Sequence, residues 1–289
     1  MTIDIGLSTR KIVSGPLELT YAKSAGPRII GIQYKGSGNL LASIPQIAIP
    51  TPYGEYHYMG GHRLWYAPEA MPRSYIPDND GVTVTELSDG VLLQGKQEVG
   101  TGIRKSIEIH LDPTGQVTLI HTLTNESLWE VELAPWTITM FRLGGTAILP
   151  FQSETVDMDG LLPDRHIALW PYSKINDPRL RFEDGFIFLC AKPNQPLFKI
   201  GVFNPRGWLA YWNQGVLFRK TFMVQTDAAL PDFGCNSEIY CDENFIELES
   251  LAPLVKLGTG SSVSHAEQWE FYDSLRQDFL PENAVRFMQ

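Results

Sequence analysis

The sequence contains few cysteines and few basic residues. Its three cysteines, Cys190, Cys235 and Cys241, include no pair at the CxxC spacing of structural zinc sites, so we expect reduced, mostly buried thiols. Lysine and arginine total 23 against 33 acidic residues, which gives a formal net charge of −10. No basic run is longer than two residues. A nucleic-acid partner is therefore not expected, because such partners are bound through clustered positive charge.

The sequence also lacks long apolar segments and the common catalytic motifs. No apolar run approaches the length that spans a bilayer, and the segment after Met1 has no apolar region of the signal-peptide kind. GxSxG, P-loop and glycine-rich dinucleotide motifs are missing, and the histidines show no helical metal-binding spacing. We therefore expect a cytoplasmic protein with no membrane partner, no cofactor and no bound metal.

The pattern of hydrophobic residues is typical of β-strands. Apolar and polar residues alternate over residues 82–85 and 91–93 around a Ser-Asp-Gly turn, and over 103–111 and 117–124 around an Asp-Pro-Thr-Gly turn. Each pair of segments predicts a hairpin. Residues 197–203, 208–212 and 216–224, separated by two further turns, predict a three-stranded meander.

Helical periodicity is confined to the end of the chain, near residues 274–279 and 282–288. The 25 glycines and 20 prolines suit many short strands joined by turns better than helices. No linker, repeat or low-complexity segment divides the sequence. Residues 1–289 are therefore predicted to form one all-β domain, an antiparallel sandwich with minimal helix, whose concave face is the natural binding site.

Three segments together resemble a known family. They are residues 60–69 (GGHRLWYAPE), 122–150 (TLTNESLWEVELAPWTITMFRLGGTAILP) and 244–272 (NFIELESLAPLVKLGTGSSVSHAEQWEFY). These segments are similar to the galactose mutarotase-like, or aldose 1-epimerase, superfamily, and most closely to a bacterial branch of it. The resemblance implies an antiparallel β-supersandwich that binds a sugar. Because the same sandwich also occurs in sugar-binding domains, glycosidases and lyases, the fold does not define the reaction.

The resemblance also implies roles for particular residues. Glu249 corresponds by position to the glutamate that acts as general base on the anomeric hydroxyl. The family's general acid is a histidine in the segment that here spans residues 125–136, and this segment contains no histidine. His62 and Arg63 are the local candidates for an arginine and a second histidine that the family places early in the chain.

The residues around Glu249 independently indicate a site. Strict alternation places Phe245, Glu247 and Glu249 on one face of a predicted strand. The Cα atoms of the two glutamates would lie about 6.6 Å apart, so their repulsion would raise the pKa of at least one of them on a desolvated face. Such a carboxyl suits general base catalysis near neutral pH. The alternative is a solvated face, as in most charged strands.

Several other residues are candidates for contacting a sugar. Gly60 and Gly61 precede His62, Arg63 and Trp65, which supply hydrogen-bonding groups and an aromatic surface. His62 and Arg63 could instead form a structural pair, and adjacent positions in a strand cannot both face the site. Further candidates are Glu69, Lys220, Glu238 and the tryptophans Trp136, Trp170, Trp208 and Trp212.

Each of these further candidates has an ordinary structural alternative. Lys220 would share one strand face with Phe218 and Phe222, but the pattern favours an exposed lysine. Glu69 and Glu238 could be surface carboxylates. Tryptophans in sandwiches mostly fill cores.

The sequence thus favours a protein that binds a small sugar or sugar derivative, with three hypotheses for its function. In the first it is an aldose 1-epimerase: Glu249 removes the anomeric proton, His62 or Lys220 assists at the ring oxygen, and the other candidates bind substrate. In the second it is a non-catalytic sugar-binding or sensing protein. In the third it is a lyase or epimerase of an acidic sugar, whose carboxylate Arg63 and Lys220 would neutralise.

Overall fold

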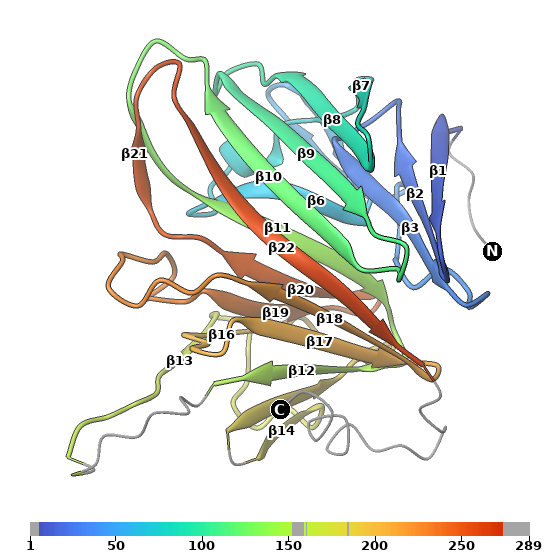
Figure 1. Cartoon of the computed structure of the whole chain (residues 1–289). Coiled ribbons are helices and arrows are strands. Elements are labelled where there is room, and N and C mark those ends of the chain that lie inside the picture. Colours follow the sequence, from blue (N-terminus) through green and yellow to red (C-terminus); the bar gives the residue numbers. More distant parts are fainter. Residues whose placement is uncertain (1–5, 152–158, 160, 184, 274–289) are drawn as a thin grey trace.

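The chain forms two large antiparallel sheets packed face to face (Figure 1). The computed structural model describes residues 6–151, 159, 161–183 and 185–273. In these residues there is no α-helix, and the single helical element is the 3₁₀ turn η1 (Arg73–Tyr75). The predicted all-β sandwich is therefore confirmed. The two predicted terminal helices lie outside the described residues.

The first sheet is ten-stranded within the described residues. Its order across the sheet is β1 (Thr9–Ser14), β2 (Leu17–Ala22), β3 (Arg28–Tyr34), β6 (His62–Ala67), β11 (Val131–Arg142), β20 (Phe245–Leu251), β19 (Ser237–Cys241), β16 (Phe198–Val202) and β13 (Ile167–Leu169), with β21 (Val255–Leu257) paired to β11. Every residue of its strands β6, β16 and β20 is buried.

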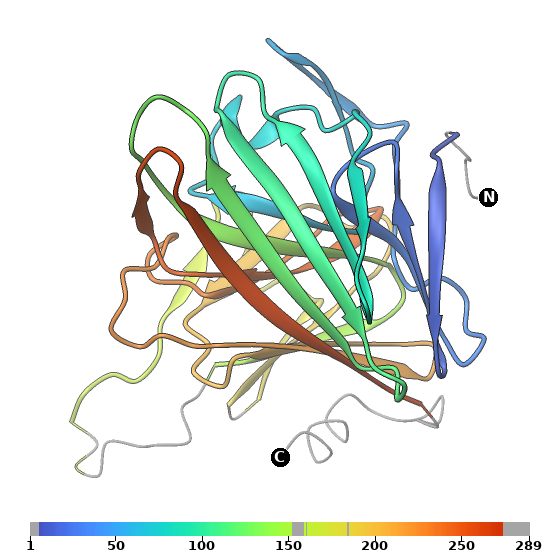
Figure 2. The same cartoon turned by 45° about the horizontal axis from the view of Figure 1, so that its top comes forward.

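The second sheet, also ten-stranded in the described residues, covers one face of the first (Figure 2). Its order is β14 (Leu180–Glu183), β15 (Phe186–Cys190), β12 (Thr146–Pro150), β17 (Trp208–Asn213), β18 (Val216–Phe222), β22 (Ser262–Tyr272), β10 (Val117–Asn125), β9 (Ile103–Leu111), β8 (Gly90–Gln97) and β7 (Thr83–Glu86). A separate hairpin joins β4 (Ala48–Thr51) and β5 (Gly54–His57).

Two of the predicted supersecondary units are confirmed, and the third is wrong in one pairing. β7 pairs with β8 and β9 with β10, and Asp112 accepts hydrogen bonds from the backbone N–H groups of Thr114 and Gln116 in the β9–β10 turn. β17 pairs with β18, but β16 pairs with β13 and β19 in the first sheet. The turn before β17 therefore carries the chain between sheets, and buried Asn204 is held there by Asn236 and Ser237.

The space between the sheets is filled mainly by apolar side chains. Phe141 of β11 lies against Tyr211 of β17 and Phe218 of β18, with ring centroids 4.9 and 5.0 Å apart. Phe198, Ile246 and Leu248 of the first sheet belong to the same cluster. This packing joins the two sheets into one core. No helix in the described part of the chain is long and apolar enough to cross a membrane.

A group of buried polar side chains, here called the interior polar cluster, interrupts this apolar layer. Its members are His62, Thr137, Thr139 and Ser250 from the first sheet and His121, Lys220, His265 and Glu267 from the second. Glu267 is its centre, because one carboxylate oxygen accepts from Lys220 Nζ (3.0 Å), Ser250 Oγ (2.7 Å) and the Thr137 hydroxyl. Its other oxygen accepts from the Trp269 indole (3.0 Å). Burial raises the pKa of Glu267, but the Lys220 ammonium and the surrounding groups together outweigh this and hold the pKa well below its usual range.

The hydrogen bonds of the cluster fix the protons of two histidines. His121 Nδ1 lies 2.9 Å from the carbonyl oxygen of His265, which can only accept, so this nitrogen carries the proton. His121 Nε2 then accepts from His62 Nε2 at 2.6 Å, and His62 Nδ1 accepts from the Thr139 hydroxyl at 2.9 Å. Burial lowers the pKa of His62, His121 and His265, the last to about 4. The three imidazoles are therefore neutral near pH 7.

The core packing predicts a large loss of stability when Phe141 is truncated. Phe141→Ala should lower the free energy of unfolding by about 3–5 kcal/mol, because it removes a fully buried ring and leaves a cavity between the sheets. Chemical denaturation measures this value. The same substitution at Phe233, which is 94% exposed, should change it by less than about 0.5 kcal/mol. Equal effects at both positions would contradict the packing described.

The neutral histidines predict a characteristic dependence of stability on pH. The folded pKa of His265 lies below its unfolded value, so the unfolded chain gains a proton first as pH falls below about 6.5. Relative to His265→Gln, the wild-type chain should lose about 3 kcal/mol of unfolding free energy between pH 6.5 and 4. Urea unfolding at several pH values measures the difference.

The control is His110→Gln, because His110 is near the surface and Asp89 raises its pKa. The contribution of His110 to stability should be present below about pH 6.5 and lost as pH rises through its folded pKa. This pH dependence is opposite in sign to that of His265. Parallel pH curves for the wild type and His265→Gln would show that His265 is not held neutral.

Candidate functional site

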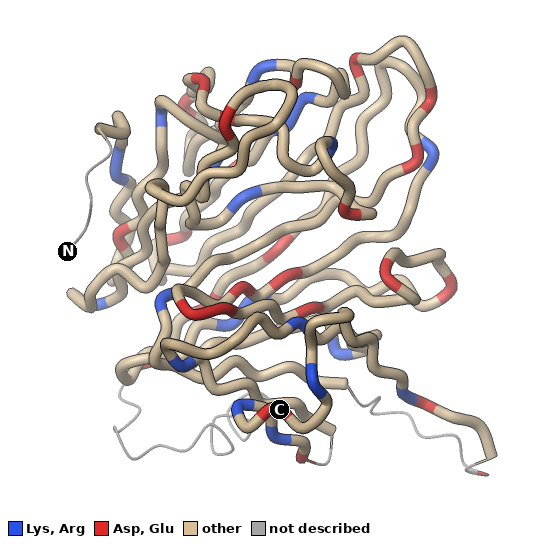
Figure 3. The backbone as a smooth tube through the Cα atoms, turned by 180° about the vertical axis from the view of Figure 1, so that it is seen from behind, with Lys and Arg blue, Asp and Glu red and all other residues tan. Residues whose placement is uncertain are grey.

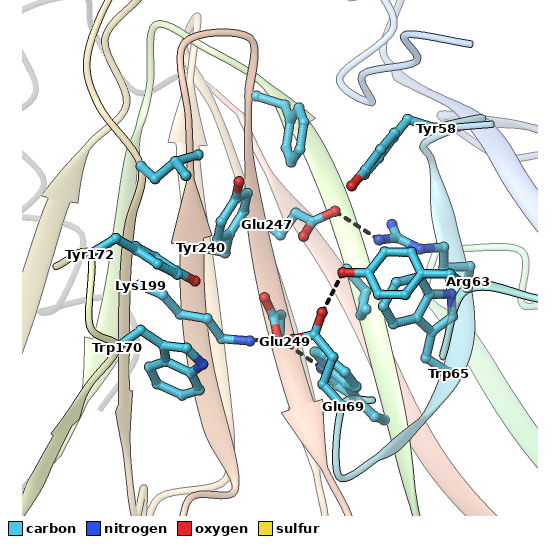
Figure 4. A pocket seen from close by; sticks show the side chains of 15 residues that line it. Tyr58, Arg63, Trp65, Glu69, Trp170, Tyr172, Lys199, Tyr240, Glu247 and Glu249 are labelled. Atoms are coloured by element: carbon cyan, nitrogen blue, oxygen red, sulfur yellow. Dashed lines mark hydrogen bonds and ion pairs between the residues drawn. The ribbon is translucent and has the colours of Figure 1, made fainter. Parts of the chain in front are cut away.

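A cavity of about 250 Å³ lies on the outer face of the first sheet, on the side away from the second sheet (Figure 4). Neighbouring strands β6, β11, β20, β19 and β16 form its floor, and the segments that follow β5, β6 and β13 add walls. It is lined by Tyr58, Arg63, Trp65, Glu69, Tyr75, Trp136, Ile138, Trp170, Tyr172, Leu197, Lys199, Tyr240, Phe245, Glu247 and Glu249. The lining therefore combines aromatic rings with carboxylates and two cations.

Strand alternation explains which side chains reach this face. In β20, Phe245, Glu247 and Glu249 line the cavity, while Ile246 and Leu248 enter the core between the sheets. In β16, Lys199 faces the cavity while Phe198 and Ile200 enter the core. Seen from behind (Figure 3), acidic and basic positions lie on neighbouring strands of this sheet.

Glu249 is 1% exposed and is held by two donors on the same carboxylate oxygen. Oε2 accepts from Trp136 Nε1 at 2.8 Å and from Lys199 Nζ at 2.9 Å. Lys199 Nζ is also 2.7 Å from Glu238 and lies 4.6 Å from the ring centroids of both Trp136 and Trp170. Burial alone would lower the pKa of Lys199, but Glu238 and Glu249 raise it well above its usual value. The lysine is therefore a fixed ammonium group beside Glu249.

A second ion pair lies on the other side of the cavity. Arg63 Nη2 donates to Glu247 Oε1 at 3.0 Å, and the guanidinium lies 5.0 Å from the Trp65 ring centroid (Figure 4). Burial raises the pKa of Glu247 and Arg63 offsets only part of that rise, so the resulting pKa is about 7. Burial likewise raises the pKa of Glu238 well above its usual value, despite Lys199. The site thus contains carboxyl groups that differ in their affinity for a proton.

The structure brings most of the predicted site residues together. Arg63, Trp65, Glu69, Glu247 and Glu249 line the cavity. Glu238 is fully buried beside it and pairs with Lys199. Glu69 is at the rim, where it accepts a hydrogen bond from the Tyr75 hydroxyl.

His62 and Lys220 are not brought to the cavity, which corrects their predicted positions. His62 precedes Arg63 in β6, so its side chain points to the opposite face of the sheet and joins the interior polar cluster. Lys220 shares a strand face with Phe218 and Phe222 as predicted, but that face of β18 packs toward the first sheet. Neither side chain can contact a ligand in this cavity.

Sequence reasoning missed Lys199, although a signal for it exists. Lys199 is the single charged residue in the otherwise apolar stretch 197–203, where alternation groups it with Gly201. A Cβ at Gly201 would lie 2.8 Å from Cys235 Sγ and 3.3 Å from both Glu238 and Trp170. The glycine therefore leaves room for the side chains that surround the lysine.

The segment in which the resemblance implies a histidine presents Trp136 to the cavity instead. Its indole N–H donates to Glu249, so this position supplies a fixed hydrogen-bond donor. Indole has no proton to transfer at neutral pH. Among the four candidate tryptophans, Trp136 and Trp170 line the cavity, and Trp208 and Trp212 pack in the second sheet.

Within the described residues, His62, His121 and Glu267 form one group with metal-ligand spacing, their ligand atoms all within 4.8 Å of one another. The hydrogen bonds described above already use the facing nitrogens of both histidines. The Lys220 ammonium, 3.0 Å from Glu267, would repel a cation there. The group is therefore explained as part of the interior polar cluster.

No family model matches the sequence, and no curated protein matches it. Several solved structures share the fold. The Slr1438 protein of Synechocystis sp. PCC 6803 superposes with a TM-score of 0.59 at 10% identity, over 95% of this chain and 100% of that one. A galactose mutarotase-like protein of Lactobacillus casei ATCC 334 gives 0.56 at 11% identity, over 92% and 100%. A galactose mutarotase related enzyme of Lactobacillus acidophilus gives 0.53 at 8% identity, over 92% and 98%.

At these identities the likeness concerns the fold alone. The similarity extends over nearly the whole chain in each case, so it covers both sheets and not a single motif. The galactose mutarotase-like β-sandwich implied by the three sequence segments is the fold of this protein.

Proposed function

We propose that this protein binds an aldose in the cavity and catalyses its epimerisation at the anomeric carbon, with Glu249 as the general base. The observation that carries the proposal is the position of Glu249. Its carboxylate lies at the cavity floor, buried among aromatic rings and fixed through one oxygen by Trp136 and Lys199. The fold of the solved relatives and the sequence resemblance support the same assignment.

The chemistry of the lining suits a sugar. The C–H faces of a pyranose pack on aromatic rings, and Trp65, Trp136 and Trp170 supply such surfaces. Hydroxyl groups need directional donors and acceptors, which the carboxylates, Arg63 and Lys199 supply. The volume of about 250 Å³ is below the roughly 300–1,000 Å³ typical of drug-sized ligands, which favours a single ring.

The contacts of Glu249 suit a base. Both of its hydrogen bonds within the described residues are made by Oε2, so Oε1 keeps its lone pairs for a substrate hydroxyl. Fixing one oxygen orients the other, and a positioned base contributes about 100-fold to 10,000-fold to a proton transfer.

The charge of the cavity argues against an acidic sugar. Its lining carries two cations, Arg63 and Lys199, and three carboxyl groups, Glu69, Glu247 and Glu249. Arg63 pairs with Glu247, and Lys199 pairs with Glu249 and Glu238. A substrate carboxylate would therefore have to compete with carboxyl groups that the protein already holds beside both cations.

One observation favours a second function, binding without catalysis. Trp136 occupies the segment in which the resemblance implies the acid histidine, and an indole cannot replace that acid. A sugar-binding or sensing protein would keep the aromatic walls without needing a proton donor. The experiment below separates the two functions.

Replacing Glu249 by Gln should remove turnover and preserve binding. The amide keeps the shape and most of the hydrogen bonding but cannot accept the anomeric proton. We expect kcat for anomer exchange to fall at least about 100-fold with KM changed little, measured by NMR exchange spectroscopy on a panel of aldoses. The matched control is Glu243→Gln, an exposed position outside the cavity, which should leave kcat unchanged.

Two results would contradict the proposal in different ways. Full exchange activity in Glu249→Gln would remove Glu249 from the mechanism. A wild-type protein that stabilises on adding an aldose but does not accelerate exchange would be a sugar-binding protein, because ligand binding raises stability without any reaction.

A further inference from the structure

Ring opening needs a proton donor that the proposed function leaves unassigned. As the bond between the anomeric carbon and the ring oxygen breaks, the ring oxygen must gain a proton. The segment 125–136 contains no histidine, and His62 and Lys220 lie in the interior polar cluster. If the proposed function holds, the donor must be another side chain that lines the cavity.

Most lining residues hold their protons too tightly for this role. Burial raises the pKa of Tyr58 to about 12, and it raises the pKa values of Tyr172 and Tyr240 as well. The pKa values of Arg63 and Lys199 are raised by the neighbouring carboxylates. The carboxyl groups remain as candidates.

Among the carboxyl groups, position separates Glu247 from Glu69. Glu69 is exposed at the rim and bonded to Tyr75. Glu247 is 6% exposed and lies two residues before Glu249 on the same face of β20, so their Cα atoms are about 6.6 Å apart. Figure 4 shows the two carboxyl groups directed to opposite partners, Glu249 toward Lys199 and Glu247 toward Arg63. A substrate above β20 can therefore contact both.

The balance of buried charge favours a proton on this group of carboxyls. Glu238, Glu247 and Glu249 are buried together with two cations, Arg63 and Lys199. Three charged carboxylates against two cations would leave one desolvated negative charge without a partner, which is costly. Burial raises the pKa of both Glu238 and Glu247, and of these two only Glu247 lines the cavity, where it can reach a substrate. Within the described residues, the one hydrogen bond that Glu247 accepts is on Oε1. Oε2 is therefore available to carry and donate a proton.

We propose that Glu247 is the general acid of the reaction in which Glu249 is the base. Glu249 takes the proton of the anomeric hydroxyl, the bond from the anomeric carbon to the ring oxygen breaks, and the ring oxygen takes the proton of Glu247. The product is the open-chain aldehyde. After rotation about the bond between the first two carbons, the same steps run in reverse: Glu247 recovers its proton and the carbonyl oxygen takes the proton held by Glu249. The opposite anomer forms with no net change in either residue.

Several titratable groups influence Glu247 from the elements around it. They are Arg63 on β6, Tyr56 and Tyr58 at and after β5, Lys199 on β16, Tyr240 on β19 and Glu249 on β20 itself. Of these, Arg63 favours the charged form and Glu249 the neutral form, and burial is the larger effect. The resulting pKa of about 7 suits an acid that works near neutral pH.

The test is the pH dependence of kcat/KM, which reports ionisations of the free enzyme. An acid must be protonated to act, so wild-type kcat/KM for anomer exchange should fall tenfold per pH unit above about pH 7. Glu247→Gln should lower kcat at least about 100-fold at pH 6, and its residual rate should lose this alkaline fall. Glu247→Asp keeps a carboxyl group and should recover part of the rate together with the fall. Glu243→Gln should reproduce the wild-type profile.

Each outcome has a distinct meaning. Full activity with an unchanged pH profile in Glu247→Gln overturns this assignment and leaves Glu249 as the proposed base. A wild-type kcat/KM that stays level or rises through pH 7 to 9 overturns it without any variant, which decides the question if Glu247→Gln does not fold. No anomer exchange in the wild type on any aldose overturns the proposed function and this assignment together.

Discussion

The central strands of the first sheet lie between two sets of buried, paired charges. A charged group removed from water is costly unless an opposite charge and hydrogen bonds replace the lost solvent. Toward the second sheet, Glu267 of β22 meets Lys220 and the hydroxyls of Thr137 and Ser250. Toward the cavity, Glu249 meets Lys199 and Glu247 meets Arg63. These pairs constrain the same central strands from opposite sides.

Adjacent residues therefore serve different parts of the molecule. In β6, His62 enters the interior polar cluster and Arg63 enters the cavity. In β20, Ser250 bonds to Glu267 and His265, and the preceding Glu249 is the proposed base. The interior polar cluster and the cavity residues are therefore attached to neighbouring backbone positions of the same strands, on opposite faces of the sheet.

Much of the fold and part of the site follow from the sequence. Period-two alternation predicts the hairpins of β7–β8 and β9–β10 and the shared face of Phe245, Glu247 and Glu249. Alternation cannot say which face of a strand meets the other sheet, and for Lys220 this decides between cavity and core. It also cannot reveal that the chain changes sheets between β16 and β17. The crossing depends on a long-range contact, the pairing of β16 with β19. This pairing places Lys199 beside Glu249.

No histidine occurs between residues 125 and 136, and the strands around this segment show which residues line the cavity in its place. Trp136 sits beside Glu249 and uses its only donor to hold that carboxylate, so it fixes the base and leaves the proton donor to another position. On β20 the next residue on the cavity face is Glu247, whose cation, Arg63, comes from β6 on the far side of β11. The two carboxyls are thus held by separate cations from different strands, and burial raises the pKa of Glu247 to about 7 despite Arg63. Different surroundings are what allow two like groups in one site to take the separate roles of acid and base.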